Sequence, residues 1–446
     1  MTRMTLSRRE FVATASLSFA SATSGSFAWR DGKTDHADKY SNWGAVRAEF
    51  DLAPGWLHFS QFFLVSHPRP VRESIERYRR LLDANPLLTV EHGMGFDLEA
   101  HTDLLPLKVQ QEAAAYLSVR PEELALTDST TQGLALIYIG LKLDAEDEIL
   151  TTTHEHFVHH EAIRLASERN GASMRRISLY DDPAEASAEQ MVDRLRRGIA
   201  PRTRAVGLTW VHSSTGVKLP VRALAQAIAD VNRNRGERDR VLLVLDGVHG
   251  LGTQDENLHA LGCDFFAAGT HKWIFAPRGT GIIWAPEKNW SLLRPTIPTF
   301  YSFDPFLAWE NGQPPSTSTQ ASWISPGGFK AYEHQWAMAD AFAFHRRIGR
   351  QRVAERIAAL NTLCKNGLRR IPRVKVFTPQ DSRLSAGIIC FAIEGQTVEE
   401  TVRKLRERKV VASASPYKVS YARLGPSLVN DADEVDAALR AVRDIA

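Results

Sequence analysis

Cysteine is scarce in this sequence, and long apolar runs are missing after its first thirty residues. The 446 residues include three cysteines, Cys263, Cys364 and Cys390, which lie far apart and lack the spacing of metal or redox motifs. We therefore expect neither a disulfide framework nor a metal site built on cysteine. Because no later run is long enough to cross a bilayer, we expect no stable membrane insertion of the folded chain.

The sequence contains no long run of charges of one sign and no visible internal repeat. The net charge is +3 without a long basic run, so the chain lacks the electrostatic footprint that a phosphate backbone requires, and nucleic acid is not an expected partner. No internal repeat or low-complexity tract is visible. At 446 residues the chain exceeds the size that a single hydrophobic core fills, which predicts a large domain and a smaller one.

The first 28 residues have the order of features found in a twin-arginine export signal. The pair Arg8-Arg9 precedes a mildly apolar stretch of small residues from Val12 to Ala28. The alternative is a flexible arm in which two arginines fall together by chance. We expect residues 1–28 to be an export signal and the mature protein to be periplasmic.

From Leu124 onward, short apolar runs alternate with segments of helical periodicity. This alternation predicts an α/β domain with a doubly wound, mostly parallel seven-stranded sheet. The candidate strands are Leu124–Thr127, Glu148–Thr152, Met174–Leu179, Ala205–Val211, Val241–Leu245, Phe265–Ala268 and Gly281–Trp284. The alternation dissolves between residues 292 and 325 and resumes as helices and short strands. We predict an N-terminal segment at 29–90, a large domain at 91–310 and a smaller α+β domain at 311–446.

Two polar side chains come shortly after apolar runs. Asp246 follows Val241–Leu245, and Lys272 follows Phe265–Ala268 by a few residues. Ligands of open α/β sheets bind outside the carboxyl ends of the strands, so we expect both side chains at one crevice. A lysine there can have its amine pKa lowered enough to attack a carbonyl. The alternatives are an aspartate that caps a turn or binds a metal, and a surface lysine.

Pyridoxal phosphate needs four groups, and the sequence offers a candidate for each. It needs an amine for its aldehyde, an acid opposite its ring nitrogen, a stacking surface and a phosphate cradle. The Ser/Thr-rich segment 127–133, between a strand and a helix start, is a candidate cradle, although such a cluster can be a simple helix cap. His156 is the candidate stacking surface; the alternative is a core or solvated histidine.

These residues resemble the class V aminotransferase group of fold-type-I pyridoxal-phosphate enzymes, which includes cysteine desulfurases, isopenicillin N epimerase-like proteins and kynureninases. The likeness covers nearly all of the mature chain and is carried by His271-Lys272, Asp246-Gly247-Val248-His249 and Pro277-Arg278-Gly279-Thr280-Gly281. The resemblance implies that Lys272 holds the cofactor as an imine, that Asp246 pairs with the ring nitrogen and that His249 lies near the ring hydroxyl. It places His156 beside Lys272 and Asp246 in the catalytic set, stacked on the ring.

The resemblance implies further contacts with the cofactor and the substrate. Thr130 and Thr131 match the first phosphate contacts, and Ser213 lies on another cofactor-side loop. Arg423 matches the arginine that binds a substrate carboxylate, a role suited to a planar guanidinium.

At one position the sequence departs from the pattern of the group. Many relatives have a phosphate-binding serine three residues before the lysine, where this chain has Gly269; Thr270 and His271 are the candidates to replace it. Relatives are usually homodimers, and Ser316–Thr319 is the candidate segment for reaching into the partner's site.

The reaction type remains open between transamination, epimerisation and elimination on a small-molecule or peptide amine. The loop 413–417 has no cysteine where desulfurases of this group present their sulfur acceptor, which disfavours desulfuration through a persulfide. A narrower similarity is to exported pyridoxal-phosphate enzymes that modify pyoverdine siderophores in the periplasm. The rival functions are a metal-dependent hydrolase built on the histidines of 154–160, which lack His-Glu-x-x-His spacing, and a non-catalytic pyridoxal-phosphate-binding protein.

Overall fold

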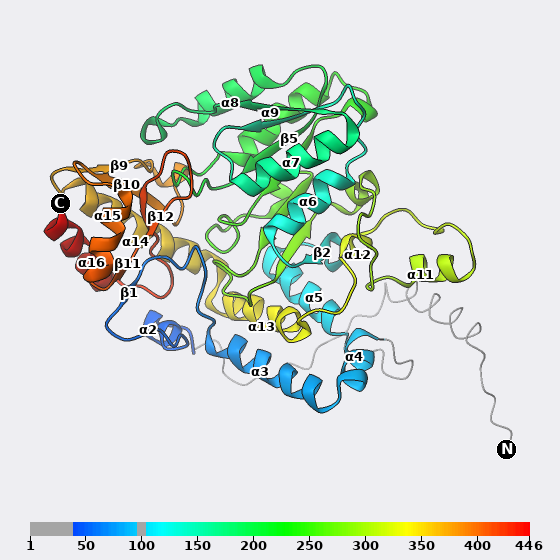
Figure 1. Cartoon of the computed structure of the whole chain (residues 1–446), viewed down its shortest axis with the longest axis horizontal. Helices are drawn as coiled ribbons and strands as arrows, with labels where there is room; N and C mark the ends of the chain where they lie inside the picture. Colours follow the sequence, from blue (N-terminus) through cyan, green and yellow to red (C-terminus); the bar gives the residue numbers. More distant parts are fainter. Residues whose placement is uncertain (1–38, 96–103) are drawn as a thin grey trace. The chain divides into compact units, whose positions relative to one another are not determined.

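A seven-stranded sheet organises this computed structural model, which describes residues 39–95 and 104–446 (Figure 1). The export signal predicted for residues 1–28 lies outside the described residues. The strands of the sheet are β2 (Leu124–Thr127), β3 (Glu148–Thr152), β4 (Ser173–Ile177), β5 (Thr203–Thr209), β6 (Leu242–Asp246), β7 (Phe265–Gly269) and β8 (Gly281–Trp284). They lie in the order β2-β8-β7-β6-β5-β3-β4; β8 pairs antiparallel with β2 and β7, and the other pairs of this sheet are parallel. The predicted α/β class and mostly parallel sheet are confirmed.

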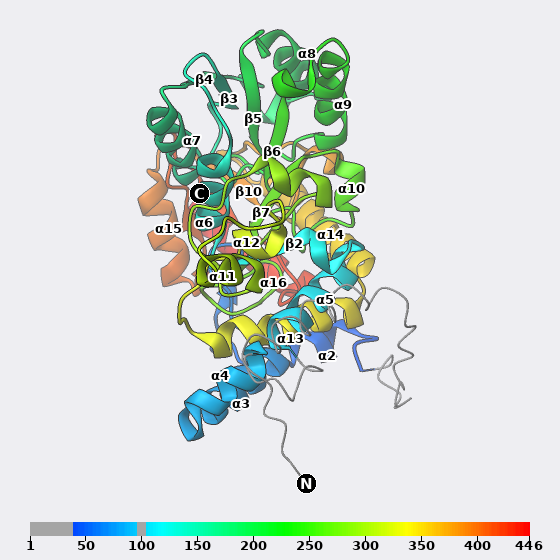
Figure 2. The same ribbon diagram turned by 90° about the vertical axis from the view of Figure 1, so that its right-hand side faces the viewer.

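Helices cover both faces of this sheet. Figure 2 shows the strands between α7 on one side and α8 and α9 on the other. The helices from the N-terminal segment to the end of the sheet region are α2 (Trp43–Arg47), α3 (Arg69–Ala84), α4 (Pro86–Met94), α5 (Leu105–Leu117), α6 (Thr130–Gly140), α7 (Phe157–Asn170), α8 (Ala188–Gly198), α9 (Val221–Asn232), α10 (Leu258–Leu261), α11 (Phe303–Glu310), α12 (Ala321–Ile324) and α13 (Tyr332–Ile348). Short 3-10 helices are η2 (Pro121–Glu123), η3 (Pro183–Glu185), η4 (Glu237–Asp239), η5 (Glu287–Leu292) and η6 (Ser382–Leu384).

The two faces of the sheet bury separate hydrophobic clusters, as the alternation along β6 shows. Leu243 and Leu245 pack with residues of α5, α8, α9 and α13, whereas Leu242 and Val244 pack with residues of α6 and α7. Every residue of β6 is buried. A strand covered on both faces has no solvent-facing positions, which explains why the sequence reads there as a continuous apolar run.

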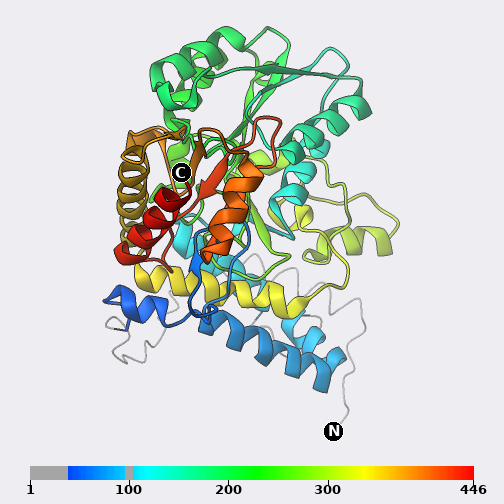
Figure 3. The ribbon, with the colours of Figure 1, turned by 60° about the vertical axis from the view of Figure 1, so that its left-hand side comes forward.

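The C-terminal part of the chain forms a smaller α+β layer (Figure 3). Its elements are β9 (Val374–Val376), β10 (Ile389–Ile393), β11 (Val410–Val411), β12 (Ser413–Ala414), β13 (Ala422–Leu424), α14 (Arg350–Arg369), α15 (Val398–Glu407) and α16 (Ala432–Ile445). Four of the strands make an antiparallel sheet in the order β12-β13-β10-β9, and β11 pairs in parallel with β1 (Leu57–His58) of the N-terminal segment. The α+β character predicted for this region is confirmed, while the boundary at 310/311 stays a prediction.

The topology gathers strand ends at one edge of the large sheet. β5, β6 and β7 are consecutive parallel neighbours, and Thr209, the last residue of β5, is the register partner of Asp246 at the end of β6. α6 and α7 begin soon after the ends of β2 and β3. Their N-terminal N–H groups therefore face the same edge. None of the helices in the described residues has both the length and the apolar character to span a membrane.

Gly207→Ala should destabilise the protein because β5 passes close to α6 and α7 at this residue. An added Cβ would lie 2.3 Å from Tyr138 Oη and 2.9 Å from His159 Nε2. Overpacking of this kind costs about 1–3 kcal/mol. Urea denaturation should show that loss for Gly207→Ala and a much smaller change for the control Gly236→Ala, whose added Cβ has no neighbour closer than 4.0 Å. Equal changes in the two variants would contradict the packing described here.

Candidate active site

Most of the predicted site residues line one pocket at the carboxyl edge of the large sheet. The pocket has a volume of about 120 Å³. Eight of the ten predicted residues line it: Thr130, Thr131, His156, Ser213, Asp246, His249, His271 and Lys272. The other two, Thr270 and Arg423, do not appear among its lining residues.

Lys272 lies in the pocket on the loop that follows β7. Within the described residues its amine makes no ion pair, and the polar atom that faces Nζ is His249 Nε2 at 3.4 Å. Burial lowers the pKa of Lys272 to about 8; the carboxylate of Asp246 opposes this shift and the guanidinium of Arg423 adds to it. Roughly a tenth of the amine is therefore unprotonated, and hence nucleophilic, at pH 7, far more than for an ordinary lysine.

Asp246 ends β6 with its carboxylate buried. One carboxylate oxygen accepts a hydrogen bond from the backbone N–H of Val248 at 3.0 Å. Burial raises the pKa of Asp246, while His159 and Lys272 act in the opposite direction. A carboxylate in this position is stabilised by a positive group placed beside it in the pocket.

The N-terminus of α6 forms one wall of the pocket. Ser129 caps the helix by accepting from the N–H of Gln132, and the first N–H groups of a helix have no partners inside it. Thr130 Oγ1 accepts from the N–H of Gly269 at 2.7 Å, which ties this wall to the end of β7. The arrangement suits an anion at the helix N-terminus.

His271 takes up the space that a side chain at position 269 would need. A Cβ built on Gly269 would lie 2.6 Å from His271 Cε1 and 3.2 Å from Thr130 Oγ1. Thr270 is fully buried and its hydroxyl is 2.6 Å from that of Thr280. Thr270 and His271 were the candidates to replace the phosphate-binding serine of relatives. Of these two residues, His271 lines the pocket and Thr270 does not.

His156 caps α7 and faces a tyrosine from the C-terminal layer. Its Nδ1 accepts from the N–H of Val158 at 3.3 Å, and its ring centroid is 5.9 Å from that of Tyr417. Burial lowers the pKa of His156, and the nearby positive charges of Lys272 and Arg423 act in the same direction. A neutral imidazole ring is thus presented to the pocket.

Beneath the pocket, Glu155 is buried inside a network of hydroxyl groups and histidines. It accepts hydrogen bonds from Thr152 at 2.7 Å and from Thr209, and it lies 3.3 Å from His159 Nδ1 and 3.6 Å from His212 Nε2. Burial alone would raise the pKa of Glu155, but the contacts with His159 and His212 hold it well below its usual value. A buried negative charge therefore lies behind the lining residues Thr209 and His212, close to Asp246.

Arg423 lies beside the pocket with much of its hydrogen-bonding capacity already used. It donates to Ser413 Oγ at 3.2 Å and to the carbonyl oxygens of Ser213 and Ala414, both at 3.0 Å. The guanidinium also lies over the ring of Phe62, 5.0 Å from its centroid. Two of its five N–H groups remain for a further acceptor.

Seven further lining residues were not among the predicted site residues, although Ser129 belongs to the candidate cradle and His154 to the histidine cluster of the rival hypothesis. The seven are Ser129, His154, Val158, Thr209, His212, Val248 and Tyr417. Thr209 could have been found as the carboxyl end of the strand next to β6. Tyr417 comes from a distant loop, where its hydroxyl is 2.7 Å from Ser213 Oγ, and no local pattern in the sequence points to it.

The histidines of 154–160 do not converge as metal ligands. His154 stacks on Tyr180 with ring centroids 3.8 Å apart, His159 is 2.7 Å from the Tyr138 hydroxyl, and His160 is 2.7 Å from the carbonyl oxygen of Thr152. Across the described residues, no group of three or more histidine, cysteine or acidic side chains could hold a metal ion. These histidines therefore do not provide the metal centre that the hydrolase hypothesis requires.

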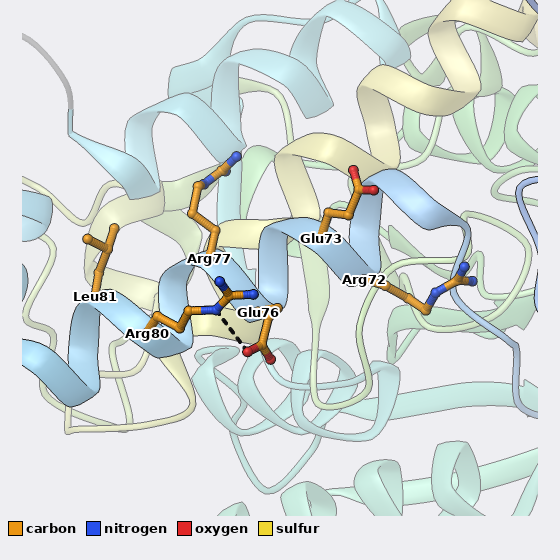
Figure 4. A pocket seen from close by; sticks show the side chains of 6 residues that line it. All are labelled: Arg72, Glu73, Glu76, Arg77, Arg80 and Leu81. Atoms are coloured by element: carbon orange, nitrogen blue, oxygen red, sulfur yellow. Dashed lines mark hydrogen bonds and ion pairs between the residues drawn. The ribbon is translucent and has the colours of Figure 1, made fainter.

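A wider hollow lies along α3 and has a different character (Figure 4). It measures about 550 Å³ and is lined by Arg72, Glu73, Glu76, Arg77, Arg80 and Leu81. These side chains come from one helix, and some pair with each other, as Arg80 Nε and Glu76 Oε1 do at 3.0 Å. Its described lining includes none of the predicted site residues, so the smaller pocket is the candidate active site.

Comparison with known proteins places this site in a family context. The profile described as "Aminotransferase class-V" matches residues 67–424. Isopenicillin N epimerase of Amycolatopsis lactamdurans is 27% identical over 363 residues, which cover 79% of this chain and 84% of that protein. A probable cysteine desulfurase of Xylella fastidiosa is 25% identical over 369 residues, covering 79% and 81%. The solved structure of a C-DES mutant with glycine covalently linked to its cofactor matches with a TM-score of 0.77 at 21% identity, covering 89% of this chain and 99% of the other.

The amine of Lys272 should titrate well below an ordinary lysine. In cofactor-free protein, the rate at which an acylating reagent modifies Lys272, followed by peptide mass spectrometry, should reach half of its maximum near pH 8. The same residue in denatured protein should show a midpoint near the ordinary lysine value of roughly 10.4. A common midpoint for folded and denatured protein would show that the pocket does not favour the neutral amine.

Proposed function

The chain belongs to the aminotransferase class-V family, and from this we propose that it is a pyridoxal-phosphate-dependent enzyme acting on the amino group of a small-molecule or peptide substrate. The observation that carries the proposal is the meeting of Lys272, Asp246 and His156 in one pocket. Asp246 ends β6, Lys272 lies on the loop after β7 and His156 precedes α7, so all three lie at the carboxyl edge of the sheet, where α/β proteins of this kind bind ligands.

The residues of the pocket fit the cofactor group by group. When bound, pyridoxal phosphate supplies an electron-accepting ring. Lys272 would hold its aldehyde, the buried carboxylate of Asp246 would face its ring nitrogen, and His156 would lie against its face. The N-terminus of α6, with Thr130 and Thr131, would bind the phosphate.

Lys272 is also suited to move a proton once its amine is free. Since burial lowers the pKa of Lys272 to about 8, both protonation states are accessible near neutral pH. This is the condition for an efficient general acid and base. Asp246 would keep the ring nitrogen protonated, because its own buried carboxylate needs a positive partner to ionise.

Within this class we propose transamination, epimerisation or elimination rather than persulfide-forming desulfuration. The loop 413–417 contains Ser413, Ser415 and Tyr417 but no cysteine. All three cysteines of the chain are buried, and burial raises the pKa of the Cys390 thiol to about 12. A buried, protonated thiol is a poor sulfur acceptor. Incubation with cysteine that yields a persulfide on any of these cysteines would contradict this part of the proposal.

Lys272→Ala should abolish turnover of amino substrates and the visible absorbance of the lysine-bound cofactor. The reason is that no other amine lines the described part of the pocket. An absorbance scan of the purified variant, followed by titration with amino acids and amino-terminal peptides, measures both effects. Lys288→Ala, which removes an exposed amine on η5, is the control and should behave as the wild type. Full activity in Lys272→Ala would disprove the assignment.

We propose that the protein acts as a homodimer. The candidate segment Ser316–Thr319 is largely exposed, and Ser316 and Thr317 bond to Asp304 at the start of α11. The same helix exposes Phe306 and Trp309, an apolar surface of the kind that protein partners cover. Size-exclusion chromatography with light scattering should give twice the chain mass; a monomer at micromolar concentration would contradict the proposal.

We propose export to the periplasm on the basis of the Arg8-Arg9 pattern. Cell fractionation should find the protein in the periplasm, and replacement of both arginines by lysine should retain it in the cytoplasm. A periplasmic double variant would contradict a twin-arginine route.

The substrate class that we propose is the side chain of a pyoverdine-type siderophore. The arginine pair of the proposed export signal supports this, as does the aromatic segment at 56–63, where the ring centroid of Phe62 lies 6.4 Å from that of His249 and Phe63 is 66% exposed. Incubation of the enzyme with precursor siderophore should change the mass of the siderophore, and Lys272→Ala should not. An unchanged mass with the wild-type enzyme would rule this substrate out.

A further inference from the structure

The residue that follows the site lysine contacts the site histidine. Trp273 Nε1 donates a hydrogen bond to His249 Nδ1 at 3.1 Å, and both side chains are buried. An indole N–H can only donate, so Nδ1 of His249 must be the accepting, unprotonated nitrogen. A neutral imidazole has a single proton, which this contact leaves on Nε2. Nε2 is the atom that faces Lys272 Nζ at 3.4 Å.

We propose that Trp273 is a positioning residue: it fixes the tautomer of His249 so that the Nε2–H group always points at Lys272 and the pocket. The proposal rests on the proposed function in so far as it treats Lys272 as the reacting amine. Any anionic oxygen bound within reach of Nε2 then meets a donor and never an acceptor.

The surroundings of His249 favour the neutral ring that this argument needs. Burial holds the pKa of His249 well below its usual value, and the positive charges of Lys272 and Arg423 and the rings of His156 and His271 act in the same direction, although the carboxyl of Asp246 lines the same pocket. A second ring proton would also place an N–H group against the N–H of Trp273. Two effects therefore disfavour the doubly protonated ring: burial removes the water that would solvate its charge, and protonation of Nδ1 would break the hydrogen bond from Trp273.

The indole of Trp273 is held in the orientation that the hydrogen bond requires. It stacks on Phe62, with ring centroids 6.4 Å apart and planes 25° apart. A Cβ built on Gly387 would lie 2.7 Å from the indole ring, and one built on Gly252 would lie 2.8 Å from the Trp273 backbone. Gly252 leaves room for the Trp273 backbone, and the close packing of the indole against Phe62 and Gly387 keeps it from turning away.

The fixed tautomer acts on the protonation of Lys272. A protonated amine has three donors and no acceptor, so it cannot receive the N–H of His249, whereas a neutral amine can. Trp273, through His249, thereby favours the neutral and nucleophilic form of Lys272. Loss of one hydrogen bond of this strength should raise the pKa of Lys272 by about half to one unit.

Nitrogen NMR of cofactor-free protein with ¹⁵N-labelled histidine tests the tautomer directly. The His249 signals are assigned by their loss in His249→Gln. In the wild type we expect the proton on Nε2. In Trp273→Phe, which keeps an aromatic ring but removes the N–H, we expect a mixture of tautomers and a Lys272 acylation midpoint raised by about half to one pH unit.

Two further proteins separate this role from simple packing. Replacement of Trp273 by benzothienylalanine changes the indole N–H to sulfur at nearly constant shape, so it should reproduce both effects even where the phenylalanine variant folds poorly. Trp290→Phe removes another buried indole, one whose Nε1 has no hydrogen-bond partner in the described structure, and should change neither quantity.

The outcomes distinguish this inference from the proposed function. A wild-type proton on Nδ1, or a tautomer and midpoint unchanged in the benzothienylalanine protein, would overturn the role of Trp273. These measurements need no bound cofactor. Failure of Lys272 to bind pyridoxal phosphate, with the tautomer as expected, would instead refute the proposed function and leave the Trp273–His249 contact as described.

Discussion

The adjacency of β6 and β7 is the constraint on which the site depends. The two strands are parallel, with Asp246 in register with Ala267, so the carboxylate that ends β6 and the loop that follows β7 come out at the same edge of the sheet. Lys272 and Asp246 are thereby brought to one pocket without a direct ion pair between them in the described structure. A pair of opposite groups kept apart in a buried site can act on the two ends of one bound ring.

The rest of the site adjusts the charge state of that pair. Asp246 is buried and Lys272 is partly buried, which moves the pKa of Lys272 down and that of Asp246 up, toward two neutral groups. His249 stabilises the neutral amine, while Glu155 adds a buried negative charge below the pocket. A cation bound beside Asp246 would lower the pKa of its carboxyl again, because the positive charge would stabilise the ionised carboxylate. The site is therefore arranged to receive a ring that carries positive charge.

Local sequence patterns were sufficient for the sheet and for the residues at strand ends. A continuous apolar run followed by a polar residue predicted β6 with Asp246 and β7 with the lysine loop, because strands buried on both faces leave that pattern. The ends of the strands could not be predicted as well. The strand predicted at Ala205–Val211 is observed at Thr203–Thr209, because Val211 instead forms a bridge with Lys218.

Contacts between distant parts of the chain could not be predicted in the same way. Tyr417 reaches the pocket from a loop of the C-terminal layer, and Thr270 is turned from it by a hydrogen bond to Thr280. Both outcomes depend on how side chains pack once the layers have formed, which periodicity does not encode. The spacing of the histidines at 154–160 likewise does not predict that His159 contacts Tyr138 and that His160 contacts the carbonyl oxygen of Thr152.

The central claim is that Lys272 is the amine that holds the cofactor, and borohydride reduction of the protein as purified tests it most directly. Reduction fixes the cofactor to its lysine, and peptide mass spectrometry then locates it. The account predicts a phosphopyridoxyl group on Lys272. Finding it on Lys365 instead, a second buried lysine whose pKa burial lowers to about 8 but whose amine is hydrogen-bonded to Pro379, Gln380 and Ser385, would contradict the account, as would a protein that carries no such group.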